Sequence, residues 1–502
     1  MTATGKYTPF LRQCFVTTAV CLNVIGHGCA LGYPGVLLPQ LHSPGSEIQL
    51  DKTTESWITA VPGLALLVGN FITLPIMGQL GRKVAHLAVC LPQLLGWILV
   101  ILAPNVEVII VGRIMKGLSF GMLLPLRSPL LGEYTTPKHR GAFLTTVSFS
   151  QAFGIFFVHL IGSLMHWQQT ALVCMFFTFI SLIMIIYSPE SPSWLLSQGR
   201  YDECKTIFRW LRGDSEEEEL EAMIRAGILF EKVMNSRKKI KVNPYRRTTE
   251  VIVKKEFYKP IILMFHLYFM SHFAGGTVMA SYSTIIVGLL LGPTANVHFW
   301  MVFLDAQRIF SNAFAIYVIS NVKRRTMLFS TCALCIVSHL AIAAYSYTRV
   351  HGLFNYDAMW LPVVLINIHM FSVAVGMVPM PSILAGEVFP LEFRSIGNCI
   401  SLASFSIFFF LCLKTFPLLS SSIGLHGTYV IYSGNLLYTM IVCWFMLPET
   451  KGKTLQQIED EYRGHPLSLE ELESRQSLQM DPIVAYNSKL SDLQCSNPIL
   501  VT

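Results

Sequence analysis

The sequence contains few charged residues: they make up 13% of its 502 residues, whereas 53% are hydrophobic. Soluble domains carry about 25% charged residues, so this composition excludes an ordinary soluble protein. Apolar stretches of about 20 residues, the length that spans a bilayer as a helix, recur along the chain. We therefore predict an all-α membrane protein whose main surroundings are lipids.

The sequence also lacks motifs on which many enzyme sites are built. It has no HExxH zinc pattern, no P-loop and no GxGxxG fingerprint, and its histidines are scattered. We therefore expect no catalytic residues, cofactor or metal, and a membrane enzyme is the least favoured class. The 12 cysteines lie mostly inside apolar stretches and form no pair of CxxC motifs at zinc spacing, so we interpret them as buried free thiols.

Twelve apolar spans are predicted, each about 20 residues long. They lie near 14–39, 57–78, 84–103, 107–130, 143–163, 170–187, 260–290, 298–320, 327–347, 360–385, 397–418 and 427–447. We divide the chain into an N-terminal six-helix bundle (1–187), a cytoplasmic segment with short helices (188–256), a C-terminal six-helix bundle (257–450) and a polar cytoplasmic tail (451–502), disordered from about residue 463.

The net charge of +7 does not indicate nucleic-acid binding, because the lysines and arginines cluster in short loops. Basic loops are typical of the cytoplasmic face of a membrane. The loops after spans two, four, eight and ten carry Arg82, Lys83, Lys138, Arg140, Lys323, Arg324, Arg325 and Arg394. The loops on the other side carry little more than Lys52 and Arg349, so we expect both termini to be cytoplasmic.

Three landmarks occur twice along the chain. GRK at 81–83 corresponds to KRR at 323–325, Glu133 to Glu387, and PESPSW from residue 189 to PETKGK from residue 448. The separations are 242, 254 and 259 residues, and each landmark follows the same span of its half. This near-constant offset indicates a duplicated six-helix unit in parallel orientation, as in transporters with two related halves.

The repeated charges predict a network at the cytoplasmic ends of the helices. Pro137 and Pro390 end one helix after Glu133 and Glu387, and Arg140 and Arg394 begin the next. Ion pairs between the halves would then close this side while the cavity opens outward. Half-solvated pairs contribute about 1 kcal/mol each, so such contacts break easily. Simple anchoring of helix ends by snorkelling side chains is the alternative.

These motifs resemble those of sugar porters of the major facilitator superfamily, most of all the insect facilitated trehalose transporters and their glucose-transporter relatives. PESPSWLLSQGRYDECKTIFRWLRG at 189–213 and LPETKGKTLQQIE at 447–459 carry the resemblance, which spans roughly residues 12–460. It implies the major facilitator fold, alternating access and a solute cavity between the halves. It assigns the gating network to Arg82, Lys83, Glu133, Arg140, Glu190, Arg324, Arg325, Glu387, Arg394 and Glu449.

Candidate solute-binding residues lie at matching depths of the spans. Some occupy positions that bind sugar in the resembling family, and others are polar side chains nearby: Ser148, Gln151, His159, Ser271, His272, Thr277 and Ser382. Hydroxyl, amide and imidazole groups suit a sugar, although intramembrane polar residues also bond neighbouring helices. Because relatives carry other side chains at several of these positions, a polyol or an organic anion as solute, or a non-transporting nutrient sensor, remain alternatives.

Charges inside the spans need a partner or water. The spans contain five such charges: Lys116, Arg127, Asp305, Arg308 and Lys414. Asp305 and Arg308 are spaced to pair within one helix. Arg127 either binds an anionic solute or snorkels to the membrane surface.

Transport is expected to be facilitated diffusion across the plasma membrane. Proton-coupled sugar porters of the resembling family carry an Asp after Gly-Tyr in the first span, where this chain has Pro34. His27 is the nearest titratable group, and we interpret it as a helix-packing histidine.

Overall fold

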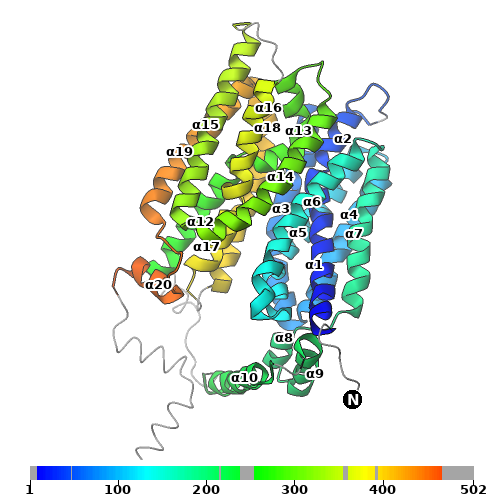
Figure 1. The fold of residues 1–502 in the computed structure, drawn as a ribbon. Coiled ribbons are helices and arrows are strands. Elements are labelled where there is room, and N and C mark those ends of the chain that lie inside the picture. The colour runs from blue at the N-terminus through cyan, green and yellow to red at the C-terminus, as the bar shows by residue number, and fades with distance from the viewer. Residues whose placement is uncertain are drawn as a thin grey trace, which may run out of the picture.

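The computed structural model describes residues 8–46, 48–213, 216–237, 254–353, 360–390 and 394–465. The side chains at 137–142, 144, 226, 229–237, 394, 395 and 455 are not described, and the expected tail beyond residue 465 lies outside these ranges. Within the described residues, twelve helical segments are long and apolar enough to cross a membrane, which confirms the predicted number of spans. They form two groups of six that stand side by side (Figure 1).

The N-terminal half is formed by the first six spans. Its helices are α1 (Thr8–Gly32), α2 (Pro34–Leu41), α3 (Lys52–Gln79), α4 (Arg82–Ile101), α5 (Val106–Tyr134), α6 (Pro137–Gly162) and α7 (Trp167–Tyr187). The C-terminal half contains α12 (Lys255–Phe273), α13 (Gly276–Leu291), α14 (Val297–Asn321), α15 (Arg324–Val350), α16 (Trp360–Ser372), the π-helical segment η2 (Val373–Met377), α17 (Pro379–Val388), α18 (Arg394–Ser422) and α19 (Gly424–Met446).

Four helices that do not belong to the spans lie on one side of the molecule, which we call the loop side; the opposite side is the far side. They are α8 (Pro192–Ser197), α9 (Tyr201–Arg212), α10 (Glu217–Arg237) and α20 (Leu455–Arg463). The start of α1 is on the loop side too, where the Arg12 guanidinium donates to the Trp210 carbonyl oxygen at 2.9 Å and Gln13 donates to that of Leu211.

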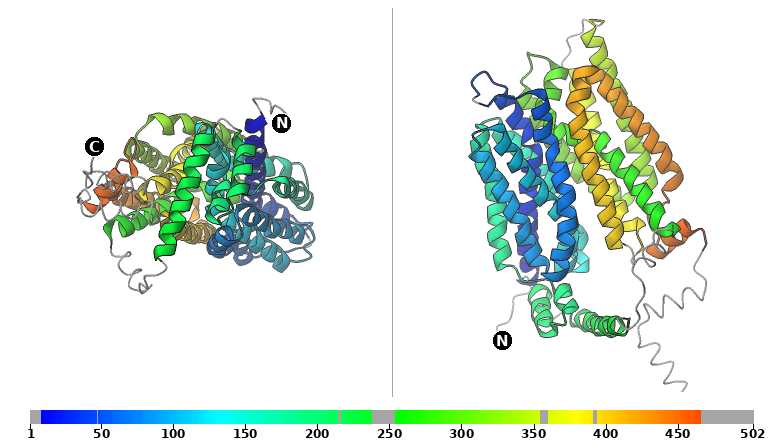
Figure 2. Two further views of the ribbon diagram at one scale, coloured as in Figure 1. Left: turned by 90° about the horizontal axis from the view of Figure 1, so that it is seen from below. Right: turned by 180° about the vertical axis from the view of Figure 1, so that it is seen from behind.

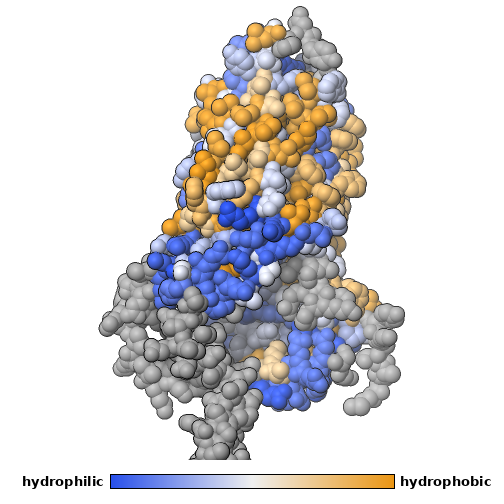
Figure 3. Space-filling model, turned by 60° about the vertical axis from the view of Figure 1, so that its left-hand side comes forward, coloured by the Kyte–Doolittle hydropathy of each residue, from blue (hydrophilic) through white to orange (hydrophobic). Residues whose placement is uncertain are grey.

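The outer face of the spans is apolar, as lipid requires. Figure 3 shows a hydrophobic band above a hydrophilic loop side on the face it displays. Large apolar side chains such as Phe445, Phe310 and Leu164 are exposed on the outer surface. Such exposure is costly in water and is typical of a surface that contacts acyl chains.

Two spans are broken at corresponding places. The first divides at Tyr33, before Pro34, and the seventh divides at Ala274–Gly275, where Gly275 has a φ of 89° that favours glycine. Tyr33 and Gly275 are 242 positions apart, the same offset that separates Arg82 from Arg324. The duplication read from the sequence therefore extends to the backbone.

Small residues bring α3 and α5 into close contact. A Cβ atom on Gly121 would lie 2.1 Å from the Leu66 carbonyl oxygen, and one on Gly69 would lie 2.3 Å from that of Leu118. In a bilayer, where the hydrophobic effect does not drive helices together, such close backbone approach supplies much of the packing energy. The α3–α5 pair is therefore a rigid core of the N-terminal half.

We expect Gly121→Ala to destabilise the protein, because the added methyl group forces two backbones apart. Overpacking of this kind costs about 1–3 kcal/mol. The measurement is the apparent melting temperature in detergent, followed by size-exclusion chromatography after heating. Gly434→Ala on α19 is the matched control, because a Cβ there meets no atom within 4 Å; equal melting temperatures for the two variants would contradict the expectation.

Candidate functional site between the two halves

The candidate site is the interface between the two halves. Across it, α3 packs against α18, α6 against α14, and α2 against α13. Hydrogen bonds between the halves cluster toward the far side, where the broken seventh span meets the broken first span. Ser281 donates to the Leu31 carbonyl oxygen at 3.3 Å, and Thr284 donates to that of Gly35 at 3.1 Å.

Side-chain pairs add to this far-side contact. The hydroxyls of Thr59 on α3 and Tyr282 on α13 form a short hydrogen bond, and both residues are buried. Lys414 of α18 donates to the Ser56 hydroxyl at 2.7 Å, and its ammonium lies 4.0 Å from the Trp57 ring centroid. A cation above an indole ring is stabilised by the ring quadrupole, so the expected partner of this intramembrane charge is provided by the other half.

His159 and Asp305 form an ionisable contact across the interface. Nδ1 of His159 on α6 contacts the Asp305 carboxylate on α14, and Nε2 lies 2.9 Å from the Gly32 carbonyl oxygen. Asp305 thus bonds a residue of the other half, and it also interacts electrostatically with Arg308 of its own helix. In this state His159 uses both ring nitrogens in protein contacts, and its role in solute binding stays a prediction.

The hydrogen bonds between the halves end part-way along α3. They run from Ser56 to Asn70, which donates to the Ser406 hydroxyl at 3.0 Å and to the Leu402 carbonyl oxygen. At 1.5 Å per residue this distance is about 21 Å. Beyond Asn70, no described residue of α3 donates to or accepts from the C-terminal half. Figure 1 and the right-hand view of Figure 2 show the two halves diverging toward the loop side.

On the loop side, the charges of the first repeat form a network inside the N-terminal half. Arg82 at the start of α4 binds Glu133 at the end of α5, with Nη2 and Oε1 2.9 Å apart. Glu190 accepts the backbone N–H groups of Arg82 and Lys83 at 2.8 and 3.1 Å. Ser191 also donates to Glu133. A carboxylate at these free N–H groups is favoured by the helix dipole.

The second repeat forms the same network inside the C-terminal half. Arg324 at the start of α15 binds Glu387 on α17 at 3.1 Å, and Thr450 donates to Glu387 at 2.5 Å. Glu449 accepts the N–H groups of Arg324 and Arg325 at 3.0 and 3.1 Å. Partial burial raises the pKa of Glu449, but the backbone N–H donors outweigh it and hold the pKa below its usual value.

These ion pairs lie within each half, and the pairs between the halves that we expect when the loop side is closed stay a prediction. Within the described residues, the ion-pair and hydrogen-bond partners of these loop-side charges come from the helices and loops of the same half. Arg140 lies in the first turn of α6 and Arg394 begins α18, but their side chains lie outside the described part of the structure. The networks therefore join the helices of each half at the side on which the halves diverge.

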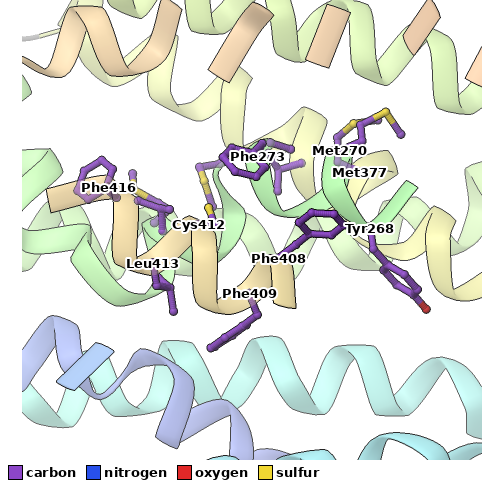
Figure 4. Packing of buried hydrophobic residues seen from close by; sticks show 14 of the residues in the cluster. Tyr268, Met270, Phe273, Met377, Phe408, Phe409, Cys412, Leu413 and Phe416 are labelled. Atoms are coloured by element: carbon purple, nitrogen blue, oxygen red, sulfur yellow. The ribbon is translucent and has the colours of Figure 1, made fainter. Parts of the chain in front are cut away.

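The break in the seventh span gathers several candidate solute-binding residues. His272 and Thr277 flank it and share a hydrogen bond of 3.1 Å between Nδ1 and Oγ1, and Ser271 is buried beside them. The His272 ring packs against Phe405 at 4.6 Å between centroids, and its buried Nε2 has no hydrogen-bond partner among the described residues. In Figure 4, Phe409 and Tyr268 point from α18 and α12 toward the N-terminal half.

The remaining candidates lie on two other helices. Ser148 is exposed and Gln151 is half-buried on α6, and Ser382 is exposed on α17. The structure thus joins His272 and Thr277, and within its described residues no hydrogen bond links them to the candidates on α6 or α17.

The other intramembrane cations have different environments. Arg113 donates to the carbonyl oxygens of Ile58 and Ala30, and the Lys116 ammonium lies 3.2 Å from the Trp97 ring centroid. Arg127 differs: among the described residues it has no hydrogen bond or ion pair, although it lies close enough to Tyr268 of α12 to interact electrostatically. The same guanidinium also interacts electrostatically with His27 of α1 in its own half.

Two further features of α1 and α5 prove to be packing. His27 contacts the Asn23 carbonyl oxygen and the Ser119 hydroxyl at 2.8 and 2.9 Å, as a helix-packing histidine would. Ser119 lies in GLSFG at 117–121, a match to the GxSxG hydrolase pattern that our sequence analysis overlooked. It is buried inside α5 without the strand–turn–helix elbow that exposes a nucleophile, so it does not indicate a hydrolase.

The family follows from a match over most of the chain: residues 10–462 fit the sugar (and other) transporter family. The chain belongs to this family. It is similar to facilitated trehalose transporter Tret1 from Bombyx mori, with 26% identity over 459 residues (89% of this chain and 86% of that protein). It is also similar to the Tret1-2 homolog of Drosophila simulans, with 24% identity over 454 residues (90% and 91%).

The fold of this sugar-transporter family member is that of the major facilitator superfamily. The proton:xylose symporter XylE bound to 6-bromo-6-deoxy-D-glucose superposes with a TM-score of 0.68 at 16% identity, covering 91% of this chain and all of XylE. The inward-open conformation of XylE from E. coli gives a TM-score of 0.69 at 15% identity, covering 90% and 99%. The two pseudo-symmetric bundles predicted from the duplication are thereby confirmed.

We expect Asp305→Asn to open the far side more often, because it removes the charge that strengthens the hydrogen bond to His159. Loss of a charge-assisted hydrogen bond costs about 1.5–3 kcal/mol, or roughly tenfold or more in the equilibrium. The measurement is the labelling rate of Ala280→Cys, buried on α13 in this contact, by a membrane-impermeant maleimide added on the far side. Glu203→Gln, in an exposed pair with Arg200, is the control; unchanged labelling in Asp305→Asn would refute the proposed role.

Proposed function

We propose that this protein is a facilitative transporter that moves a sugar of the trehalose or glucose type across the plasma membrane by alternating access. The main observation that supports alternating access is that the halves are joined by hydrogen bonds on the far side and diverge on the loop side. Its relatives named for trehalose transport support the choice of solute.

The loop-side networks give each half the stiffness that a rocking motion requires. Arg82 with Glu133, and Arg324 with Glu387, join helices that would otherwise separate independently. We propose that the same charges, with Arg140 and Arg394, meet across the halves when the loop side closes. The full gating set is Arg82, Lys83, Glu133, Arg140, Glu190, Arg324, Arg325, Glu387, Arg394 and Glu449.

The solute would bind at mid-membrane beside the break in the seventh span. His272 offers a buried Nε2 without a partner, Thr277 offers a hydroxyl, and Phe405 supplies an aromatic face nearby. These are the groups with which a protein binds a sugar: polar atoms for the hydroxyls and a ring for the apolar face. Ser148, Gln151, Ser271 and Ser382 complete the proposed set.

Transport is proposed to be uncoupled, with the loop side in the cytosol. Tyr33 and Pro34 occupy the break in the first span, and neither supplies a carboxylate that a proton could titrate. The short loops on the loop side are the basic ones, which favours the cytosol for that side and for both ends of the chain.

A second solute class, an organic anion such as a sugar acid, is favoured by Arg127. Its guanidinium lies on α5 near Tyr268 of α12 and is not neutralised by any described acid. A carboxylate entering between the halves would supply that charge, and a guanidinium binds a carboxylate in bidentate fashion. An uncharged sugar gives no such electrostatic gain.

The test is uptake of labelled trehalose, glucose and gluconate by oocytes at pH 5.5 and 7.5. We expect saturable sugar uptake, with an internal sugar concentration that never exceeds the external one. The uptake rate should fall about tenfold or more in Arg324→Ala, because that variant frees α15 from α17. Arg200→Ala, which removes an exposed arginine from a surface pair, should transport normally.

Each other outcome selects a different function. Gluconate uptake that is lost in Arg127→Gln would establish an organic anion as the solute and overturn the proposal of an uncharged sugar. Accumulation above the external concentration would overturn uniport. Absence of any flux, with normal surface abundance, would contradict transport and leave a non-transporting sensor.

A further inference from the structure

A cluster of three ligand-type side chains lies inside the C-terminal half, apart from the interface. Cys335 and His339 are one turn apart on α15, so they share a helix face, and His369 projects from α16. All three are buried, and their ligand atoms lie within 4.8 Å of one another. The two Nε2 atoms are 3.0 Å apart, and the Cys335 sulfur is 3.9 Å from Nε2 of His339.

The two Nε2 atoms of this cluster are joined through a single proton. Nε2 of His369 lies 2.9 Å from the Ala274 carbonyl oxygen, so it must carry the proton there, and His339 can only offer a lone pair to the same N–H group. Within the described residues, both Nδ1 atoms are buried and have no hydrogen-bond partner. A metal ion bound to both Nε2 atoms would displace the proton between them, and the remaining proton of each ring would then lie on Nδ1.

The separations fit a three-coordinate metal ion after small side-chain shifts. Metal–nitrogen bonds of about 2.0 Å and a metal–sulfur bond of about 2.3 Å place the nitrogens about 3.5 Å apart and each nitrogen about 3.7 Å from the sulfur in a trigonal plane. The observed 3.0 and 3.9 Å differ from those separations by about half an ångström or less. The third separation, at most 4.8 Å, closes by a small rotation of Cys335.

The charge of the site selects among metals. One thiolate and two neutral imidazoles carry a single negative charge, and the candidate cluster contains no carboxylate. A divalent ion would leave one net positive charge buried between helices, which is costly. A monovalent ion leaves none, and thiolate with imidazole are ligands that suit Cu⁺.

We propose that Cys335, His339 and His369 bind one Cu⁺ ion. The site joins α15 to α16 directly beside Ala274 and Gly275, where the seventh span is broken. A Cβ on Gly275 would lie 3.2 Å from the His369 ring, so ring and break are in contact. The ion stabilises the C-terminal half at the point where its backbone is irregular, and a cysteine expected to be an inert thiol becomes a ligand.

The test is anaerobic titration of the purified full-length protein with Cu⁺, in competition with bathocuproine disulfonate, and in parallel with Zn²⁺. We expect one Cu⁺ per chain, bound at least tenfold more tightly than Zn²⁺, and at least tenfold weaker binding in Cys335→Ser and His369→Gln. X-ray absorption of the loaded wild type should show one sulfur at about 2.3 Å and two nitrogens at about 2.0 Å.

Cys332→Ser is the matched control, because Cys332 lies on the same helix, is equally buried and has its sulfur 4.0 Å from the Leu436 carbonyl oxygen. It should bind Cu⁺ like the wild type. Three results would overturn the proposal: tighter binding of Zn²⁺ than of Cu⁺, an unchanged Cu⁺ affinity in Cys335→Ser, or an X-ray absorption spectrum of the wild type without one sulfur and two nitrogen ligands. The X-ray absorption result decides the matter even if the ligand variants do not fold.

Discussion

Hydrogen bonds between two rigid six-helix halves can be complete on only one side of the membrane at a time. In this structure the far side holds them: Tyr282 reaches Thr59, Asp305 reaches His159, and Lys414 reaches Ser56. Each joins groups that would be costly to leave without a partner in a low-dielectric interior. Opening the far side therefore requires water or solute to replace these partners, which links a change of state to what occupies the space between the halves.

On the loop side, the charged groups find their partners within each half. There the carboxylates of Glu133, Glu190, Glu387 and Glu449 are satisfied inside their own half, by arginines and by the free N–H groups of α4 and α15. The halves can diverge on this side without leaving those charges unpaired. Half-solvated ion pairs contribute only about 1 kcal/mol each, so the same side chains can exchange partners when the halves close.

Much of the fold was predictable because lipid leaves few alternatives. Span number, the duplication and the loop-side residues follow from hydropathy and from motifs repeated at an offset of about half the chain. Contacts between helices were not predictable in this way. The partner of Asp305 lies 146 positions away on α6, and no local pattern distinguishes it from Arg308, three residues along the same helix. The pairing of Arg82 with Glu133 instead of with the other half likewise depends on which state the halves adopt.

The most direct test of opposed motion uses spin labels on the two sides and double electron–electron resonance in lipid nanodiscs, with and without saturating trehalose. One pair, Leu80→Cys with Ser320→Cys, reports the loop side, and the other, Leu102→Cys with Val350→Cys, reports the far side; all four positions are exposed. We predict that a population with a shorter loop-side distance appears together with one of longer far-side distance. Distances that stay fixed, or that change in the same direction on both sides, would contradict alternating access between these halves.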